Sequence, residues 1–490
     1  MVLTRVILRG IGLVSTLILV RVLTPDAFGV VGLASSVYAI LDVLTTTGFN
    51  LAIIRMPEPQ RIHFDTAWSM SLLRGALIGL CLILTSGLQA DFMGDQRIKP
   101  LMWILAITSV LQSLESARMM DLQRELKFDL IMRYSVVNKI VTFGISVPMV
   151  LVLQNYWPLI LGPMLAKLII IPYSYWLAPY RPRFTLGAWS ELFHFSKWLV
   201  LGNVCFMADI QVMNFIVGRY LGMSAVGLYQ VGNQIAGLPI SEIAVPIRQP
   251  IYSGFSKIYH DVNALRDQFM KGLELQIVVL VPLSMGLAAT AHEVTAIFLG
   301  RRWDTVVPLL PMLAIFGLFE AISYYQYNIF TVLNRQKLFT LTHYATLLIR
   351  IPLTIWADQA DGIHGAVAAM LTTSVINVIM FSFQTRPLLE LTLGRVLVAI
   401  WRGIVAGLLM WGSVALLTRW LGSELPSGPT ALVLRLALQV AVGAVVYLCS
   451  LLVLWFISGA PPTSAEAQIL RTARDGVARF KSCLVIWSGI

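Results

Sequence analysis

Residues 21–55 read RVLTPDAFGVVGLASSVYAILDVLTTTGFNLAIIR, and residues 219–249 read RYLGMSAVGLYQVGNQIAGLPISEIAVPIRQ. Four residues of the first stretch recur in the second at a constant offset of 198 positions: Arg21, Leu23, Ala27 and Gly29 correspond to Arg219, Leu221, Ala225 and Gly227. In each stretch a polar turn opens a long apolar segment, which is typical of the start of a membrane helix. The pattern predicts that the chain contains two copies of one helical membrane unit.

A second pair of motifs extends the repeat. Residues 122–128 (LQRELKF) and residues 333–339 (LNRQKLF) match at an offset of 211 positions. The two copies therefore have nearly the same length, with a small insertion in the second. Each copy is predicted to hold six helices, an even number, so both enter the membrane from the same side. This arrangement is that of parallel repeats, in which a substrate site lies between the two halves.

The composition excludes an ordinary soluble protein. The chain has 490 residues, of which 57% are hydrophobic and only 12% are charged, about half the charged fraction of soluble domains. Apolar runs near 20 residues recur throughout. We predict an all-α integral membrane protein with about 14 transmembrane helices, arranged as two six-helix repeats plus two extra C-terminal helices. The predicted spans are 3–23, 28–52, 67–89, 100–117, 131–153, 157–178, 196–218, 225–248, 272–293, 307–331, 338–357, 363–385, 396–418 and 432–457.

The spans define four regions. Residues 1–195 form an N-terminal six-helix bundle, and residues 196–385 form its repeat. Residues 386–458 hold helices 13 and 14. Residues 459–490 form a basic tail, in which the spacing of Thr463 and Glu466 predicts a helix start. An interfacial helix on membrane lipids and a disordered tail are both compatible with this pattern.

The distribution of Lys and Arg predicts the orientation. With the N-terminus in the cytoplasm, the loops on that side and the tail collect 24 basic residues, against 8 on the far side and 4 inside spans. Cytoplasmic loops of membrane proteins are enriched in Lys and Arg. The net charge of +11 therefore reports orientation and not nucleic-acid binding. Both termini are predicted to be cytoplasmic.

Motifs for catalysis or metal binding are missing from the sequence. The four cysteines have no metal or disulfide spacing, and the six histidines are scattered. The chain has no phosphate-binding glycine loop, HExxH motif or nucleophile elbow. We predict no metal, no cofactor and no enzymatic activity.

Ionisable residues inside predicted spans are the candidate functional residues, because each costs roughly 3 kcal/mol or more in the membrane unless it faces a cavity or a partner. Lys167 lies near the middle of its span, too deep for its side chain to reach water. It therefore needs a polar lumen or a carboxylate. The acidic candidates are Asp42, Asp209 and Glu320.

Two repeat-related helices each carry a cation on a polar face. His343, Thr346, Arg350 and Thr354 share one helix face by spacing. The 211-residue offset relates Arg350 to Lys139, so Lys139, Arg350 and Lys167 are predicted to give a basic lumen between the halves. Tyr324 and Tyr327 could stack on sugars there. In the simpler interpretation, carboxylates neutralise the cations as structural contacts and the tyrosines pack or lie at the membrane interface.

Several motifs together resemble bacterial polysaccharide-export flippases. Residues 21–29, residues 47–55 (TGFNLAIIR), the LQRELKF motif, residues 298–303 (FLGRRW) and residues 362–367 (GIHGAV) carry the likeness, which covers roughly residues 10–385. The most similar type is the Wzx-like branch of the multidrug/oligosaccharidyl-lipid/polysaccharide exporter superfamily.

The resemblance implies an alternating-access flippase in the bacterial inner membrane. Its implied substrate is an undecaprenyl-pyrophosphate-linked oligosaccharide, moved for surface polysaccharide biosynthesis. A basic lumen suits an anionic pyrophosphate. The polysaccharide polymerase and export machinery are implied as partners. The alternatives are a cation-coupled multidrug exporter of the same fold and, less favoured because the far-side loops are short, a membrane glycosyltransferase or polymerase.

Overall fold

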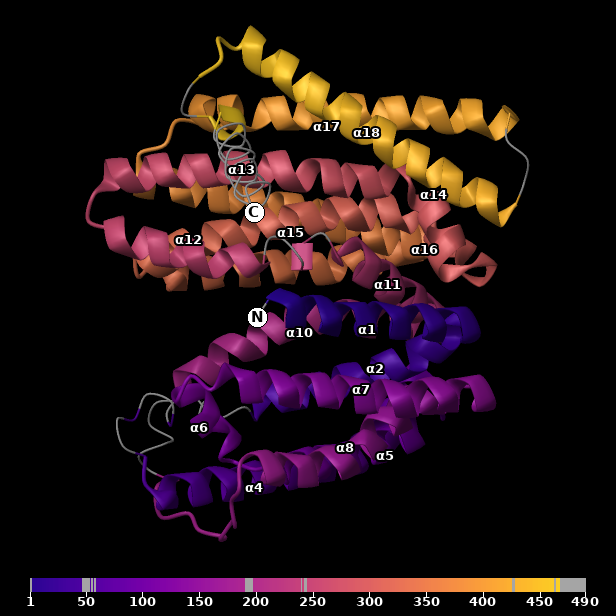
Figure 1. Ribbon diagram of the computed structural model, residues 1–490, viewed down its shortest axis with the longest axis vertical. Coiled ribbons are helices and arrows are strands. Elements are labelled where there is room, and N and C mark those ends of the chain that lie inside the picture. The colour runs from indigo at the N-terminus through magenta and orange to yellow at the C-terminus, as the bar shows by residue number, and fades with distance from the viewer. Residues whose placement is uncertain are drawn as a thin grey trace, which may run out of the picture. The chain divides into compact units, whose positions relative to one another are not determined.

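The protein is described from a computed structural model of the full chain, shown as a ribbon in Figure 1. The structure describes residues 2–45, 53, 56, 59–189, 197–238, 240–241, 245–424, 428–461 and 464–467. Within these residues the regular structure is helical throughout. Nine of the described helices are long and apolar enough to cross a membrane.

In the residues that the structure describes, the first repeat contains six long helices and one short one. The short helix α6 (Met119–Arg124) precedes α7. The long helices are α1 (Val2–Val22), α2 (Pro25–Leu44), α4 (Arg61–Met93), α5 (Ile98–Ser113), α7 (Phe128–Leu153) and α8 (Trp157–Leu177). Each corresponds to one predicted span.

The second repeat contains α10 (Lys197–Leu221), α11 (Met223–Ala236), α12 (Val245–Ile258), α13 (Val262–Ala289), α15 (Leu309–Val332) and α16 (Gln336–Leu389). The 54-residue helix α16 is interrupted at Asp361 and Gly362, where the backbone leaves helical geometry, so it supplies two spans. Short helices α14 (Ala291–Val294), η2 (Thr295–Leu299) and η3 (Arg301–Val306) precede α15, and α17 (Leu393–Glu424) and α18 (Pro429–Ile457) follow α16. With α11 and α12 counted as one span, the described helices match the predicted all-α fold of fourteen spans.

Two predicted boundaries are wrong. The span predicted at 225–248 ends too early, because α12, which follows α11 (Met223–Ala236), runs from Val245 to Ile258; residues 239 and 242–244 lie outside the described residues. The stretch that the predicted spans leave between residues 248 and 272 is largely helical, because α12 continues to Ile258 and α13 begins at Val262. Asp261 starts α13 by accepting hydrogen bonds from the backbone N–H groups of Asn263 and Ala264. A capped helix can extend beyond the apolar layer, so hydropathy alone places its start too late.

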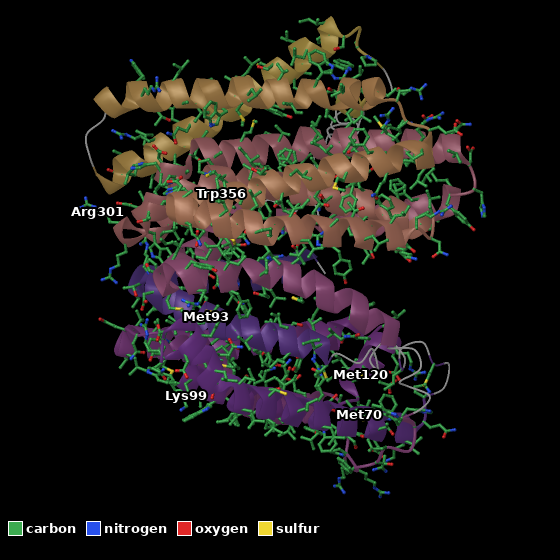
Figure 2. The ribbon with its side chains drawn as sticks, turned by 180° about the vertical axis from the view of Figure 1, so that it is seen from behind. Met70, Met93, Lys99, Met120, Arg301 and Trp356 are labelled. Atoms are coloured by element: carbon green, nitrogen blue, oxygen red, sulfur yellow. The ribbon has the colours of Figure 1, made fainter. Side chains whose placement is uncertain are left out.

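The chain divides by contacts into two compact units. Unit 1 comprises residues 1–231 and 358–363, and unit 2 comprises residues 232–357 and 364–490. Helix α10 therefore packs with the first repeat; Asn214 Nδ2 donates to Ser36 Oγ of α2 at 2.9 Å. Figure 2 shows Met70 and Met120 at one end of unit 1 and Met93 and Lys99 at the other. The repeat boundary predicted at residues 195 and 196 concerns the duplication and stays a prediction.

The beginning of the tail lies against helices of unit 2. Glu466 is buried and forms an ion pair with Arg402 of α17, with 3.1 Å between Oε1 and Nε. The backbone N–H of Ala465 donates to Glu274 of α13 at 3.1 Å. Thr463 and residues 468–490, where the interfacial helix is predicted, lie outside the described residues.

Local sequence explains the start of α2, which opens the repeated motif. Thr24 caps the helix by accepting from the Ala27 N–H at 3.4 Å, and Pro25 occupies the first turn. Arg97 holds this end by pairing with both Asp26 and Asp95. Burial raises the pKa of the Asp95 carboxyl, but the hydrogen bonds and charge of Arg97 outweigh burial and lower it. Asp95 therefore stays ionised.

The repeated glycines bring the equivalent helices α2 and α11 into backbone contact. A Cβ added at Gly29 would lie 1.7 Å from the Met223 carbonyl oxygen, and one added at Gly227 would lie 1.8 Å from the Pro25 carbonyl oxygen. Pro25 and Met223 are themselves 198 positions apart, so the contact is reciprocal. A local two-fold relation requires this reciprocity. The glycines recur because only residues without a Cβ allow this approach.

We predict that Gly29→Ala and Gly227→Ala each lower the melting temperature of the purified full chain in detergent. The added methyl would meet a backbone oxygen that cannot move independently, and such overpacking costs about 1–3 kcal/mol. Gly87→Ala is the control, because a Cβ there would meet nothing within 4 Å and alanine favours the helix. Equal melting temperatures for Gly29→Ala and Gly87→Ala would contradict the close contact.

Candidate functional site

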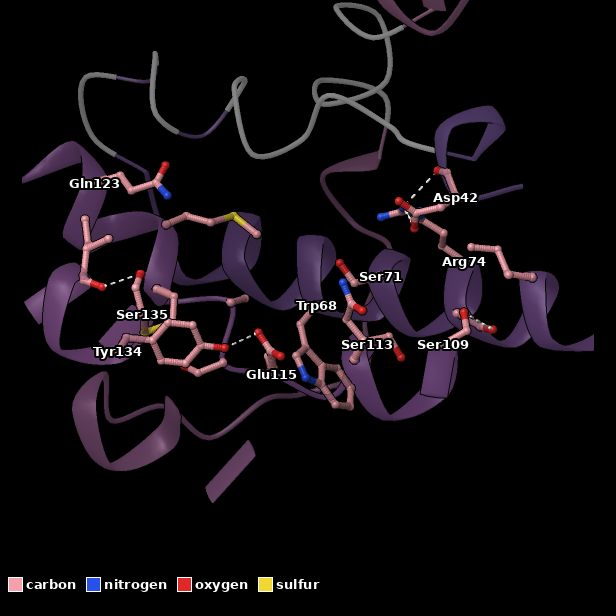
Figure 3. A pocket seen from close by; sticks show the side chains of 18 of the residues that line it. Asp42, Trp68, Ser71, Arg74, Ser109, Ser113, Glu115, Gln123, Tyr134 and Ser135 are labelled. Carbon is pink, nitrogen blue, oxygen red and sulfur yellow. Dashed lines mark hydrogen bonds and ion pairs between the residues drawn. The ribbon is translucent and has the colours of Figure 1, made fainter. Parts of the chain in front are cut away.

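A polar cavity of about 390 Å³ lies inside unit 1, among α2, α4, α5, α6 and α7 (Figure 3). Its volume falls within the range of small-ligand sites. Hydroxyl, amide and charged groups line it together with apolar side chains. The lining residues are Tyr38, Asp42, Trp68, Ser71, Arg74, Gly75, Ile78, Ser109, Gln112, Ser113, Glu115, Ser116, Ala117, Met119, Met120, Gln123, Ile131, Tyr134 and Ser135.

An ion pair between α2 and α4 forms one wall of the cavity. The Arg74 guanidinium pairs with the Asp42 carboxylate and also donates to the Asp42 backbone oxygen at 2.9 Å. Its Nε donates to Thr45 Oγ1 at 3.2 Å. Asp42, predicted as a polar lumen residue, therefore lines a cavity within one repeat. The paired charges neutralise each other, so this wall is polar without being strongly basic.

A second ion pair lies at another part of the cavity. Lys167 Nζ of α8 is 2.6 Å from Glu115 Oε1, and the Tyr134 hydroxyl of α7 donates to Glu115 Oε2 at 2.7 Å. Figure 3 shows the Tyr134 hydroxyl pointing at Glu115. The expected carboxylate partner of Lys167 exists, but it is Glu115, which was not among the three acidic candidates. Glu115 falls at the end of a predicted span, where a solvated carboxylate is the usual interpretation.

The remaining lining groups suit a ligand rich in hydroxyls. The Tyr38 hydroxyl is 3.4 Å from Gln112 Oε1, and Ser109 Oγ donates to the Gly75 backbone oxygen at 3.2 Å. The Gln112 amide and the serine and tyrosine hydroxyls can both donate and accept hydrogen bonds. Sugars present the same mixture of groups. The cavity can therefore bind a neutral or zwitterionic polar ligand.

Arg350 lies in unit 2 and is buried, with 3% of its surface exposed. Its Nε donates to Thr373 Oγ1 at 3.0 Å, and its Nη2 is 3.8 Å from Glu320 Oε1 of α15. The structure thus joins two predicted lumen residues in one ion pair. This pairing matches the simpler interpretation, in which a carboxylate neutralises the cation.

The aromatic candidates pack near one another in unit 2. The His343 ring stacks on Phe339 with centroids 6.0 Å apart, and Tyr327 contacts Phe339 edge-on at 4.6 Å. Tyr324 and Tyr327 are half-buried. Packing accounts for Tyr327 and His343, and a role in stacking on sugars stays a prediction.

Lys139 differs from its repeat equivalent. Lys139 is exposed on α7 and lies beside Gly12 of α1. A Cβ built at Gly12 would be 3.5 Å from the Lys139 Nζ. No carboxylate of the described residues lies within ion-pair distance of it. The 211-residue offset that relates Arg350 to Lys139 places Ser109 at the position of Glu320, so the first repeat lacks that carboxylate.

Asp209 is buried on α10 of unit 1. The predicted lumen between the repeats stays a prediction.

Several proteins similar in sequence to this chain are named for polysaccharide biosynthesis. The chain is 23% identical over 406 residues to the lipopolysaccharide biosynthesis protein WzxC of Escherichia coli K12, covering 81% of this chain and 82% of WzxC. It is 23% identical to the teichuronic acid biosynthesis protein TuaB of Bacillus subtilis 168, over 88% of both chains. It is 24% identical to the succinoglycan biosynthesis transport protein ExoT of Rhizobium meliloti 1021, covering 89% of this chain and 88% of ExoT.

Solved structures share the fold. The lipid II flippase MurJ in an inward closed conformation superposes with a TM-score of 0.73 and 14% identity, over 93% of this chain and 99% of MurJ. An inward-facing multidrug transporter of the MATE family superposes with a TM-score of 0.59 and 13% identity, over 77% of this chain and 94% of the transporter.

The family model described as polysaccharide biosynthesis protein matches residues 18–308, which is more than half of the chain. This range contains the repeated glycines, the reciprocal contact and the whole polar cavity of unit 1. The chain belongs to this polysaccharide biosynthesis protein family.

Proposed function

We propose that the protein is a flippase that moves undecaprenyl-pyrophosphate-linked oligosaccharide units across the bacterial inner membrane for surface polysaccharide biosynthesis. The carrying observation is the polar, hydroxyl-lined cavity among α2, α4, α5, α6 and α7 in unit 1. Relatives named for three different polysaccharides and the fold shared with a lipid II flippase support it. A cavity of this kind shields the hydrophilic sugar while the lipid tail stays in the membrane.

We further propose that alternating access carries the substrate and that the protein performs no chemistry on glycan bonds. Lys139 and Arg350 hold the pyrophosphate, and Lys167 adds positive potential. Arg350 and Lys167 each face a carboxylate in this structure, so an incoming phosphate would compete with Glu320 and Glu115. Lys139 has no such competitor among the described residues and is the cation most readily available.

The proposal also covers the orientation of the protein in the membrane and the proteins that use the flipped units. Both termini lie in the cytoplasm, as the Lys and Arg distribution indicates, and a reporter fused to the C-terminus measures this directly. An extracytoplasmic reporter signal would overturn the orientation. The polysaccharide polymerase and export machinery act on the delivered units. Crosslinking in cells that recovered neither component would count against this partnership.

We predict that Lys139→Ala and Arg350→Ala each reduce polymer export roughly ten- to hundredfold in a strain lacking its own flippase. A charged hydrogen bond contributes about 1.5–3 kcal/mol, which corresponds to this range. Arg350→Lys should keep part of the activity, because the charge survives while the planar fork is lost. Lys257→Ala is the control, since Lys257 is exposed on α12.

The readout is surface polymer per unit of protein in the membrane, measured by immunoblot. Normal export by both alanine variants at normal abundance would show that these cations are structural. Export of cationic drugs in place of polymer would favour the multidrug exporter of the same fold. Elongation or cleavage of a lipid-linked glycan by the purified protein would establish an enzyme.

The ion pair at the cavity gives a separate prediction. Glu115→Gln and Lys167→Met should each lower the melting temperature, because removing one partner of a largely buried pair leaves an uncompensated charge and costs about 3–5 kcal/mol. The double variant should regain much of this loss. The matched control is the exposed pair Glu125 and Lys127, 2.6 Å apart, whose removal should change nothing measurable. Additive losses at Glu115 and Lys167 would contradict a direct pair.

A further inference from the structure

A second pocket, of about 760 Å³, lies at the end of unit 1 where α4 begins and α8 ends. It is separate from the polar cavity; none of its lining residues is shared. Three segments distant in sequence form it: the start of α4, the region of α6, and the chain after α8. The lining residues are Pro59, Arg61, Phe64, Arg118, Asp121, Arg124, Glu125, Tyr175, Pro179, Tyr180 and Arg181.

The lining of this pocket is rich in arginine. Four of its side chains are arginines and two are carboxylates, which leaves a net charge of +2. Asp121 forms ion pairs with two of the arginines, at 3.0 Å from Arg124 and 3.9 Å from Arg118. Glu125 pairs with Lys127 at 2.6 Å. Arg61 pairs with Asp65, which lies outside the lining, at 3.5 Å. The arginines of the lining outnumber its carboxylates, so the pocket attracts anions.

Hydrogen bonds across the segments fix the walls of the pocket. Arg61 donates to the Arg181 backbone oxygen at 3.1 Å, and Arg118 donates to that of Pro179 at 3.4 Å. The buried carboxylate of Asp65 accepts from the Tyr180 hydroxyl and from the Arg183 N–H. The side chains of Arg61 and Arg118 remain more than half exposed beside their carboxylate partners Asp65 and Asp121, so a ligand can reach both guanidinium groups. The arrangement is thus preorganised.

The location of the pocket indicates the kind of anion. Helices α4 and α8 are both candidate membrane spans, and the pocket lies where α4 begins and α8 ends. Because the end of a span meets the membrane surface, we expect the pocket to lie near the lipid headgroups. All four arginines belong to the side that their distribution predicts to be cytoplasmic. Planar guanidinium groups bind phosphate oxygens in pairs, and basic pockets at this level bind lipid headgroups.

We propose that this arginine pocket binds the phosphate of an anionic lipid headgroup at the cytoplasmic surface. The site is distinct from the polar cavity, and it requires no assumption about the transported sugar. Bound lipid bridges the α6 region to the ends of α4 and α8. Phosphatidylglycerol represents the lipid source of the phosphate, and inorganic pyrophosphate represents the free anion.

The test titrates the delipidated, purified full chain in neutral detergent with phosphatidylglycerol or phosphatidylcholine and counts bound lipid by native mass spectrometry. We expect phosphatidylglycerol to bind and Arg118→Gln/Arg124→Gln to weaken binding roughly ten- to hundredfold, by the strength of charged hydrogen bonds. Arg335→Gln is the matched control, because Arg335 is the repeat equivalent of Arg124, is exposed, and lies outside the pocket. It should bind as the unmodified protein does.

Arg181→Gln is the second variant if the double variant does not fold, because Arg181 contacts Arg61 through its backbone, which the substitution keeps. Displacement of phosphatidylglycerol by pyrophosphate assigns recognition to the phosphate alone, whereas retention assigns it to the whole headgroup. Equal binding of phosphatidylcholine, or equal binding by the pocket variants and Arg335→Gln, would overturn the proposal.

Discussion

A charge among apolar helices needs an opposite charge from a neighbouring helix, and this constraint shapes the interior of the protein. Several charged residues that hydropathy places inside spans have such a partner among the residues that the structure describes. The pairs are Arg74 with Asp42, Lys167 with Glu115, Arg350 with Glu320, and Arg402 with Glu274. Three of these pairs join two different helices, and the Lys167–Glu115 pair joins α8 to the connection between α5 and α6. Within unit 1, Asp42, Arg74 and Glu115 of the first two pairs line the polar cavity.

Helix α2 shows how two local requirements combine. Near its start, Gly29 allows backbone contact with α11, and Arg97 holds Asp26. Near its other end, Asp42 pairs with Arg74 of α4 and lines the cavity. The reciprocal glycine contact relates the two repeats, while the ion pair belongs to one repeat alone. The duplication thus supplies the framework, and residues that differ between the copies supply the site.

Much of the fold could be predicted from sequence, because the apolar run length, the Lys and Arg bias and the repeat offsets each depend on the chain alone. The start of α13 could not, since its capped first turns are polar. The carboxylate facing Lys167 also escaped prediction. Which carboxylate faces Lys167 depends on how the chain packs in three dimensions. Glu115 lies at the end of a predicted span, where the sequence alone suggests contact with water. Tyr134, which completes this contact, had no distinguishing pattern.

The repeat predicted the same environment for Lys139 and Arg350, and the described residues show different ones. Arg350 is buried against Glu320, whereas Lys139 is exposed and its equivalent carboxylate is replaced by Ser109. An internal repeat conserves the position of a residue on its helix more strictly than the neighbours around it. Lys139 is therefore the more exposed of the two cations.

Flipping of the lipid-linked oligosaccharide is measured most directly in proteoliposomes. These contain the purified protein and a labelled undecaprenyl-pyrophosphate-linked oligosaccharide. A membrane-impermeant lectin reports how fast glycan from the inner leaflet reaches the outside. If the protein flips this lipid, the glycan appears outside faster than in protein-free vesicles, and Lys139→Ala slows its appearance markedly. Folded protein that leaves the rate equal to that of empty vesicles would contradict it.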